Sequence, residues 1–334
     1  MLRSRPMVVL RPLTHRVLMG VLSAVFLSAA SPWARSLPSY IGGFLLELRD
    51  GNRQRISRLE ASGIAYSQGR LVVVDDVLSS LFVFDRLGIL SQMVSLEGFP
   101  AEGAKFEDLA FDEVSQSFFA VGSHSGWEQD KLQATSVLLR FRLKEGAEGL
   151  EPTANRIETF PLYKSFEQLG LWRPKGMKIE GLAFNPLSSE LYVGLREPTD
   201  RARVYRLLLS DLENAAKGGP PAELELAANF DAGMIEDTPF SISSLLWVPE
   251  RHGLLIGTST EDESTHRFRG NRLWFYSTGG RVELLQDTFD RGKKAEGLTQ
   301  GDDYLYISYD NDQDDTELPS YVRTLPMESL FGPD

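Results

Sequence analysis

The feature that most constrains this chain is an internal repeat. A short apolar run, a turn rich in Asn, Pro, Asp or Gly, and a second run of β-branched and aromatic residues occur together five times. The copies span 62–76, 107–125, 180–197, 243–260 and 296–312. Runs of this composition between turn residues are typical of paired β-strands. A pattern repeated in this way indicates an array of equivalent β units.

Each copy is followed by further strand-like runs. A third run lies at 81–86, 136–143, 203–209, 272–277 and 320–327, and a fourth at 89–96, 156–162, 222–230 and 281–289. The last copy lacks a fourth run, which the unpaired segment 40–48 can supply. This pattern predicts an all-β fold, a β-propeller of five four-stranded blades closed by an N-terminal strand. The alternatives are a sixth blade that includes 166–172, a long β-sandwich, or two tandem β domains.

The N-terminal segment has the pattern of a secretory signal peptide. No acidic residue precedes Glu47, and 17–30 is an apolar run that is short for a membrane span. Four arginines come before or border this run: Arg3, Arg5, Arg11 and Arg16. Small residues up to Ala30 predict cleavage after that position, and an uncleaved anchor is the alternative. We therefore expect a signal peptide over 1–30 and one propeller domain over 31–334, in a periplasmic or secreted protein.

Composition excludes several classes of partner. The net charge is −12, and removal of four arginines makes it more negative. Such a surface repels nucleic acid and anionic lipid, so we expect neither nucleic-acid binding nor membrane binding after cleavage. The chain has no cysteine, which excludes disulfides and thiolate chemistry. We expect a monomer stabilised by an ordinary apolar core.

The repeat also predicts where charged residues gather. In an antiparallel pair, the start of the first strand lies beside the end of the second. Three first strands begin with Lys-x-Glu, where the other two copies place Ser62 and Ser243. The residues expected at one channel mouth are Lys105, Glu107, Lys178, Glu180, Lys294 and Glu296 from first strands, and Asp75, Asp76, His124, Arg196, Glu197, Glu261, Asp310, Asn311 and Asp312 from second strands.

Three carboxylates near one axis require compensation, because like charges raise one another's pKa. One compensator is a hard cation such as calcium, which prefers oxygen ligands. The other is an internal ionic ring formed with the lysines and Arg196, and a mixed site that binds an anionic group is a third option. The candidate residues are Glu107, Glu180, Glu296 and Asp310 as metal ligands, Lys105, Lys178, Lys294 and Arg196 as substrate-binding residues, and Glu180, His124 and Arg196 as catalytic residues.

Two familiar motifs do not fit. The run Asp310-x-Asp312-x-Asp314 resembles the start of a calcium loop, but Asp315 and Tyr321 replace the Gly and Glu of an EF-hand. His124 lies in GSHSG, which is not the G-x-S-x-G elbow of serine hydrolases. His124 is therefore a candidate general base, ligand or hydrogen-bonding residue.

The repeated E-G-L-A, with KGMKIEGLA and VGLREP, resembles the phytase-like, esterase-like β-propeller domains of exported bacterial proteins, in a poorly characterised branch. The resemblance covers 58 to about 325. It implies calcium and phosphoester binding at Glu107, Glu180 and Glu296. The chain departs from true propeller phytases in its three repeated lysines and in favouring five blades over six.

Three functional hypotheses follow. The first is a calcium-assisted ester or phosphoester hydrolase that acts on a small anionic or ester ligand at the channel mouth. The second is a non-enzymatic periplasmic propeller that binds a ligand or a protein and has an ion-paired Lys/Glu channel. The third is a sugar-lactone hydrolase with one central calcium, for which Asn311 is the one suitably placed asparagine. The sequence leaves open whether the protein is an enzyme.

Overall fold

The computed structural model describes residues 42–45, 59–75, 80–95, 104–146, 149–152, 157–262, 267–310 and 320–332. The chain divides into two units, 1–39 and 40–334, and all described residues belong to the second. The signal peptide expected over 1–30 lies outside the described residues.

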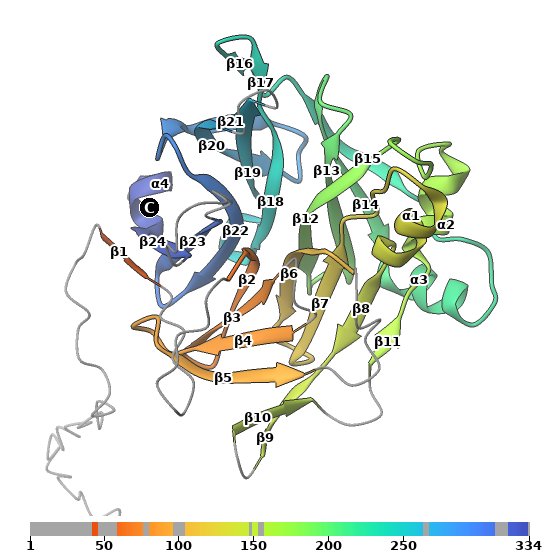
Figure 1. Ribbon diagram of the computed structural model, residues 1–334, viewed down its shortest axis with the longest axis horizontal. Helices are drawn as coiled ribbons and strands as arrows, with labels where there is room; N and C mark the ends of the chain where they lie inside the picture. Colours follow the sequence, from red (N-terminus) through yellow and green to blue (C-terminus); the bar gives the residue numbers. More distant parts are fainter. Residues whose placement is uncertain are drawn as a thin grey trace, which may run out of the picture. The chain divides into compact units, whose positions relative to one another are not determined.

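The described chain forms five four-stranded antiparallel sheets, which are the blades of a propeller (Figure 1). Blade 1 contains β2 (Ala61–Ser67), β3 (Arg70–Asp75), β4 (Ser80–Phe84) and β5 (Leu90–Ser95). Blade 2 contains β6 (Phe106–Asp112), β7 (Ser117–Gly122), β8 (Leu138–Phe141) and β11 (Glu158–Thr159). Blade 3 contains β12 (Lys178–Asn185), β13 (Glu190–Glu197), β14 (Ala202–Leu208) and β15 (Glu225–Phe230).

The last two blades complete the ring. Blade 4 contains β18 (Ser241–Val248), β19 (Gly253–Asp262), β20 (Arg267–Ser277) and β21 (Val282–Phe289). Blade 5 contains β22 (Lys294–Gly301), β23 (Tyr304–Asp310), β24 (Tyr321–Pro326) and β1 (Gly42–Leu45). The first strands contact one another in the order β2, β6, β12, β18, β22 and back to β2, so they surround a central channel. The predicted five-bladed propeller is confirmed.

The N-terminal strand closes the ring, as the sequence predicts. β1 pairs antiparallel with β24, with Gly42 opposite Thr324 and Leu45 opposite Tyr321. The edge of the last blade is thereby paired by the other end of the propeller unit.

Blade 2 differs from the expectation at its outer edge. Only Glu158–Thr159 of the predicted run 156–162 forms a strand, and α2 (Leu162–Gln168) begins three residues later. Pro161 lies between them, and its missing N–H ends the strand ladder. The run 166–172 therefore belongs to a helix and the loop after it, and there is no sixth blade among the described residues.

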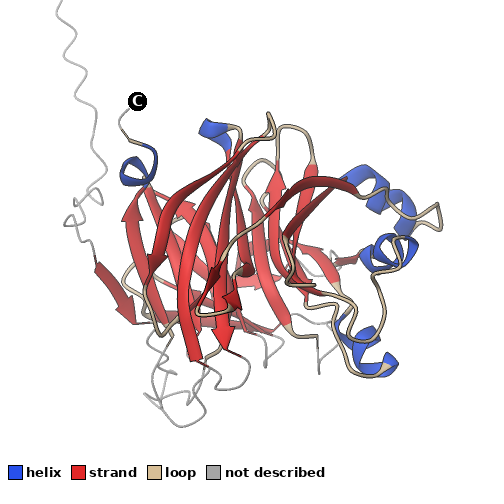
Figure 2. Ribbon diagram, turned by 90° about the horizontal axis from the view of Figure 1, so that it is seen from above, coloured by secondary structure: helices blue, strands red, loops and turns tan. Residues whose placement is uncertain are grey.

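The remaining elements lie around the blades, and Figure 2 shows the helices outside the body of strands. They are α1 (Gln129–Thr135), α3 (Leu209–Ala216), α4 (Met327–Phe331), the 3₁₀ turn η1 (Pro249–Arg251), and the small hairpins β9–β10 (Leu143–Gly146, Gly149–Pro152) and β16–β17 (Met234–Ile235, Thr238–Pro239). Within the described ranges no helix has the length and apolar character needed to cross a bilayer.

The turn between first and second strands is fixed by its own side chains. In blade 3 the Asn185 Oδ1 accepts a hydrogen bond from the Leu187 N–H at 3.0 Å. In blade 2 the Asp112 Oδ1 accepts one from the Val114 N–H at the same distance. Such Asx turns reverse the chain locally, which explains the Asp and Asn at this point in blades 2 and 3.

Aromatic pairs between neighbouring blades hold the first strands in place. Phe119 of blade 2 stacks on Phe184 of blade 3 with ring centroids 4.9 Å apart. Tyr192 of blade 3 stacks on Trp247 of blade 4 at 5.7 Å. These buried contacts set the spacing of the strands that line the channel.

Candidate functional site

Every first strand has a β-bulge at the same position, near the end of the channel at which the first strands begin. The pairing of first and second strands skips one residue in each blade. The skipped residues are Ser62, Glu107, Glu180, Ser243 and Glu296, and all five are buried. A bulge leaves its extra residue unpaired and redirects its side chain. The repeated Glu or Ser therefore occupies the bulge of each blade.

Glu180 is the centre of an ion-pair network at this level. Its Oε1 lies 2.5 Å from the Lys178 Nζ, 2.7 Å from the Arg196 Nη1 and 3.6 Å from the Lys294 Nζ. Lys178 and Arg196 come from blade 3, and Lys294 comes from blade 5. One carboxylate oxygen thus attracts three cations from two blades.

Further contacts extend the network to four blades. Lys178 Nζ lies 3.5 Å from Glu107 Oε1 in blade 2, and Arg196 Nη2 lies 2.6 Å from Glu261 Oε2 in blade 4. Lys294 also pairs with Glu296 on its own strand. We call this set the ionic cluster; it consists of Glu107, Lys178, Glu180, Arg196, Glu261, Lys294 and Glu296.

The four carboxylates of the cluster exceed its three cations, and the glutamates respond differently. Burial raises the pKa of Glu180, but Arg196, Lys178 and Lys294 outweigh it and hold that pKa well below its usual range. Burial raises the pKa of Glu296 to about 7; Lys294 opposes this rise, while the charges of Glu180 and Glu107 add to it. Glu180 is therefore a fixed anion, and Glu296 can exchange a proton near neutral pH.

Two predicted site residues lie in different surroundings. Lys105 is exposed and has a φ of +43°, unlike the partly buried Lys178. His124 is fully buried, and its Nδ1 lies 2.9 Å from the Gly122 carbonyl oxygen. Because a carbonyl only accepts, Nδ1 carries the proton. The Nε2 atom is then an acceptor, and among the described residues it has no hydrogen-bond partner.

Burial lowers the pKa of His124 to about 4, with the Gly122 carbonyl opposing the change. The imidazole is therefore neutral near pH 7. Its hydrogen bonds hold it within blade 2: the ring bonds Gly122, and its backbone N–H donates to the Thr135 carbonyl oxygen. The catalytic role expected for His124 stays a prediction.

The cluster does not provide the ligand set that calcium requires. Glu180 and Glu296 are bonded to lysine or arginine. In the described ranges no three His, Asp or Glu residues are grouped so that they could hold a metal ion. Asp310 ends β23 opposite Lys294, and Asn311 and Asp312 lie outside the described residues. Calcium binding at this mouth stays a prediction.

Asp108, one residue after Glu107, has a central position that the sequence reasoning missed. Its Oδ2 accepts hydrogen bonds from the Leu182 N–H at 2.8 Å, the Ser244 hydroxyl at 3.1 Å and the Leu245 N–H at 3.3 Å. The Ser244 Oγ in turn accepts the Leu298 N–H at 3.0 Å. Asp108 and Ser244 thus link the first strands of blades 2 to 5 across the channel.

Glycine occupies the equivalent position in three of the other blades. The strand positions equivalent to Asp108 are Gly63, Gly181, Ser244 and Gly297. A Cβ on Gly63 would lie 2.5 Å from the Leu109 nitrogen, so no larger side chain fits there. The signal was present in the sequence: the second copy reads E-D-L-A where the third reads E-G-L-A and the fifth E-G-L-T.

Comparison with known proteins adds little to this description. No family model and no curated protein matches the sequence. An exo-β-1,3-galactanase from Phanerochaete chrysosporium aligns with a TM-score of 0.49 and 10% identity, over 85% of this chain and 64% of its own. The extracellular domain of a hybrid two-component system protein from Bacteroides thetaiotaomicron aligns with a TM-score of 0.39 and 11% identity, over 83% and 28%.

A protein of unknown function from the same bacterium aligns with a TM-score of 0.42 and 14% identity, over 83% of this chain and 60% of its own. The chain thus spans less than two thirds of each of these structures. Similarity at this level carries no argument about activity. The chain is identified by its own architecture, a five-bladed β-propeller closed by its N-terminal strand.

Proposed function

We propose that the protein is a β-propeller that binds a small polar ligand at the ionic cluster without converting it. The observation that carries this proposal is the bonding of Glu180, whose Oε1 faces three cations. A carboxylate with so low a pKa is a poor proton acceptor, and its charge stabilises its neighbours. The second hypothesis, a non-enzymatic propeller with an ion-paired channel, has this arrangement as its basis.

The chemistry of the ligand is suggested by buried polar atoms that have no hydrogen-bond partner in the described part of the chain. Among these atoms are Glu180 Oε2, Ser243 Oγ and Thr260 Oγ1. Ser243 occupies the bulge of blade 4, and Thr260 precedes Glu261 of the cluster. Buried polar atoms normally have partners. One carboxylate oxygen and two hydroxyls suit a hydroxyl-rich ligand that both donates and accepts hydrogen bonds.

A thermal-shift screen of the purified chain with polyols, neutral sugars, sugar acids and sugar phosphates tests this proposal, followed by calorimetry on any ligand found. The screen also tests the anionic ligand expected from the sequence. Ser243→Ala and Thr260→Val remove hydroxyls without partners, so they should leave the stability nearly unchanged. We expect each to weaken binding by about tenfold, the equivalent of about 1.4 kcal/mol.

An exposed control, Ser188→Ala, should bind like the wild type. Unchanged affinity in both Ser243→Ala and Thr260→Val would place the ligand elsewhere. The absence of any ligand in the screen would remove support for a binding role with this chemistry.

A hydrolase is the second candidate, and Glu296 is the residue that favours it. A buried carboxyl group with a pKa of about 7 suits proton transfer near neutral pH. The reaction would be the ester or phosphoester hydrolysis expected from the sequence. Assays on generic carboxyl and phosphate esters, with and without calcium, should then show turnover that Glu296→Gln abolishes. Turnover equal to that of the variant, or none, rejects this candidate.

A further inference from the structure

The channel has a second mouth, at the opposite end from the ionic cluster. It is a cavity of about 490 Å³, lined by residues of all five blades at the turns between first and second strands. Its inner end is apolar, because Asp108 and its equivalents in three other blades are directly followed by leucines: Leu109, Leu182, Leu245 and Leu298. A cavity of this volume is of the size that holds small organic ligands.

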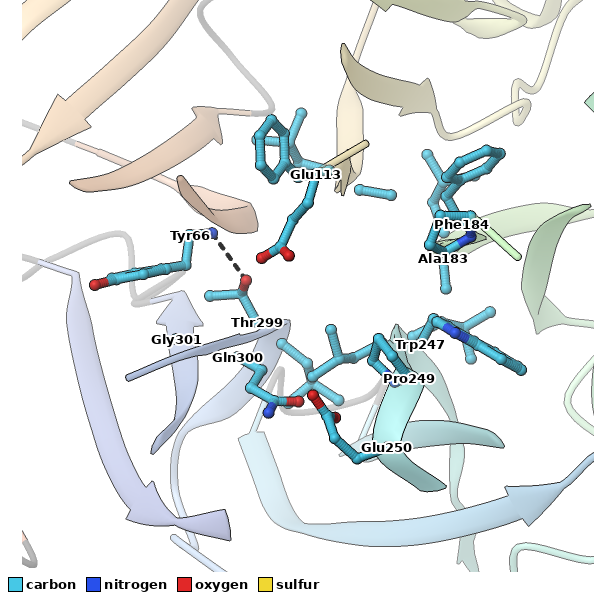
Figure 3. A pocket seen from close by; sticks show the side chains of 18 of the residues that line it. Tyr66, Glu113, Ala183, Phe184, Trp247, Pro249, Glu250, Thr299, Gln300 and Gly301 are labelled. Atoms are coloured by element: carbon cyan, nitrogen blue, oxygen red, sulfur yellow. Dashed lines mark hydrogen bonds between the residues drawn. The ribbon is translucent and has the colours of Figure 1, made fainter. Parts of the chain in front are cut away.

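Trp247 carries a buried hydrogen-bond donor at the edge of this cavity. The residue is only 5% exposed, and among the described residues its indole Nε1 has no hydrogen-bond partner. The ring stacks on Tyr192 with centroids 5.7 Å apart and planes 15° apart, which fixes its orientation. Figure 3 shows the ring nitrogen on the side of the indole that faces the cavity. Since buried N–H groups normally have partners, this donor is suited to an acceptor atom on a molecule in the cavity.

The other polar side chains that extend into the cavity mostly accept hydrogen bonds. Gln300 is partly buried, and its Oε1 has no partner in the described part of the chain. No Lys, Arg or His lines the cavity, and the lining carboxylates are Glu113, Glu250, Asp302 and Asp303. Figure 3 shows the Glu113 carboxylate pointing toward the middle of the cavity and Glu250 beside Gln300. A molecule that satisfies all of these groups donates hydrogen bonds and also accepts one.

These requirements select one class of ligand. An ammonium group has no acceptor for the Trp247 N–H, and an anion is repelled by the lining carboxylates. A hydroxyl group donates and accepts at the same time, and it carries no charge. The leucines at the inner end provide an apolar surface for the C–H groups that lie between the hydroxyls of a sugar ring.

We propose that the second mouth binds a neutral sugar, at a site separate from the ionic cluster. One hydroxyl oxygen of the sugar accepts the Trp247 N–H. Other hydroxyls donate to Gln300 Oε1 and to the Glu113 carboxylate, and a hydrogen bond to a charged acceptor is stronger than one between neutral groups. The C–H face of the ring packs against the leucines.

Nuclear magnetic resonance of the full-length protein with ¹⁵N-labelled tryptophan tests the proposal, with glucose, xylose and maltose as probes. The indole N–H signal of Trp247 is assigned as the one that Trp247→Phe removes. We expect this signal to shift saturably with at least one of the three sugars. Gln300→Met removes an acceptor at similar side-chain length, so it should weaken the binding that this signal reports by about tenfold.

Calorimetry with the same sugar measures the contribution of the indole N–H itself. Trp247→Phe keeps an aromatic ring beside Tyr192 but lacks the donor, and should weaken binding by about tenfold. The matched control is Trp127→Phe, at a position that is 78% exposed and does not line the cavity, and it should bind like the wild type. Glucuronate, which has a carboxylate in place of the primary alcohol of glucose, should bind at least about tenfold more weakly than glucose.

The proposal is overturned if no sugar shifts the Trp247 signal saturably, if Trp247→Phe and Trp127→Phe bind alike, or if glucuronate binds as tightly as glucose. Ser243→Ala lies at the other mouth and should leave the titration of the Trp247 signal unchanged. This variant separates the outcome from that of the ligand-binding proposal for the ionic cluster, because either site can fail alone.

Discussion

Glu180 and Glu296 are chemically identical residues at equivalent bulges, yet the residues around them give them different proton affinities. Glu180 faces three cations. Glu296 has one lysine at hydrogen-bonding range, and burial raises its pKa, with a further rise from the charges of Glu180 and Glu107. Removing a partner from such a buried network leaves uncompensated charge, which costs more than the pair itself contributes. Single substitutions therefore separate the roles of the two residues.

Glu180→Gln should destabilise the fold by about 3–5 kcal/mol, because Arg196, Lys178 and Lys294 lose their shared anion in a buried site. Urea denaturation measures the change in the free energy of unfolding. Glu167→Gln, at an exposed position, serves as the control and should change it by less than about 0.5 kcal/mol. A loss for Glu180→Gln as small as that of the control would show that the cluster contributes no stability.

The raised pKa of Glu296 makes stability depend on pH. The pKa is 4.5 in the unfolded reference and about 7 in the folded protein, so the folded state binds the extra proton. The stability that protonated Glu296 contributes is complete below about pH 4.5 and is lost as the pH rises through 7. Glu296→Gln should remove this decline, so that the variant gains stability over the wild type between pH 5 and 8.

Denaturation at several pH values tests this expectation. His124 has the opposite effect on stability, because burial in the folded protein lowers its pKa from 6.5 to about 4. The stability that neutral His124 contributes is lost as the pH drops from 6.5 to 4. His124→Gln therefore separates the two effects. A wild type and Glu296→Gln variant with parallel pH profiles would contradict the assignment.

At the scale of elements, all five blades share a first strand with a β-bulge. The bulge holds Glu or Ser, and the residue after it is glycine in three blades. The glycines are needed where strands meet. A Cβ at Gly63 would lie 2.5 Å from backbone, whereas one at Gly257 would first meet a leucine methyl at 3.3 Å. Backbone cannot move aside as a methyl group can.

Gly63→Ala should therefore destabilise the protein by about 1–3 kcal/mol or more, and Gly257→Ala by clearly less. Thermal and urea unfolding of the two variants provide the comparison. Equal effects would mean that the β2–β6 contact is not the tight one.

The sequence allows the hairpins to be predicted because turn residues and apolar alternation are local signals. It also predicts which charged residues gather at one mouth, since pairing antiparallel strands is a geometric rule. The bulge, the choice of Glu180 as the common anion and the burial of His124 depend on how blades approach one another. Asp108 was missed for a related reason, since its partners Leu182 and Leu245 lie on other blades.

At the scale of the molecule, ring closure joins segments from opposite ends of the propeller. A chain that starts after residue 48 lacks β1, so that β24 keeps β23 as a neighbour but its outer edge is unpaired, while a chain that starts after residue 35 keeps both strands. Each lost ladder hydrogen bond should reduce stability by roughly 0.5–1.5 kcal/mol. We expect the shorter chain to melt at a lower temperature and to be cleaved faster by a protease. Identical melting of the two chains would show that closure is dispensable.

Export is the other expectation for the whole chain. If the N-terminal pattern is a signal peptide, a bacterial host should deliver the protein to its periplasm with an N-terminus at Ser31. N-terminal sequencing and mass spectrometry of the periplasmic fraction measure this. Full-length protein retained with the membrane would favour the uncleaved anchor.

Asp108 and its equivalents in the other blades, Gly63, Gly181, Ser244 and Gly297, show where identical repeats would not fit together. Five copies of the E-G-L-A sequence would leave the axis empty at this level, whereas five copies of E-D-L-A would bring five carboxylates together. The observed set combines three glycines, one serine and one aspartate, so a single carboxylate, that of Asp108, bonds first strands of other blades. A rotationally repeated sequence must therefore lose its symmetry where its copies meet. Propellers built from identical repeats would need another way to fill that point.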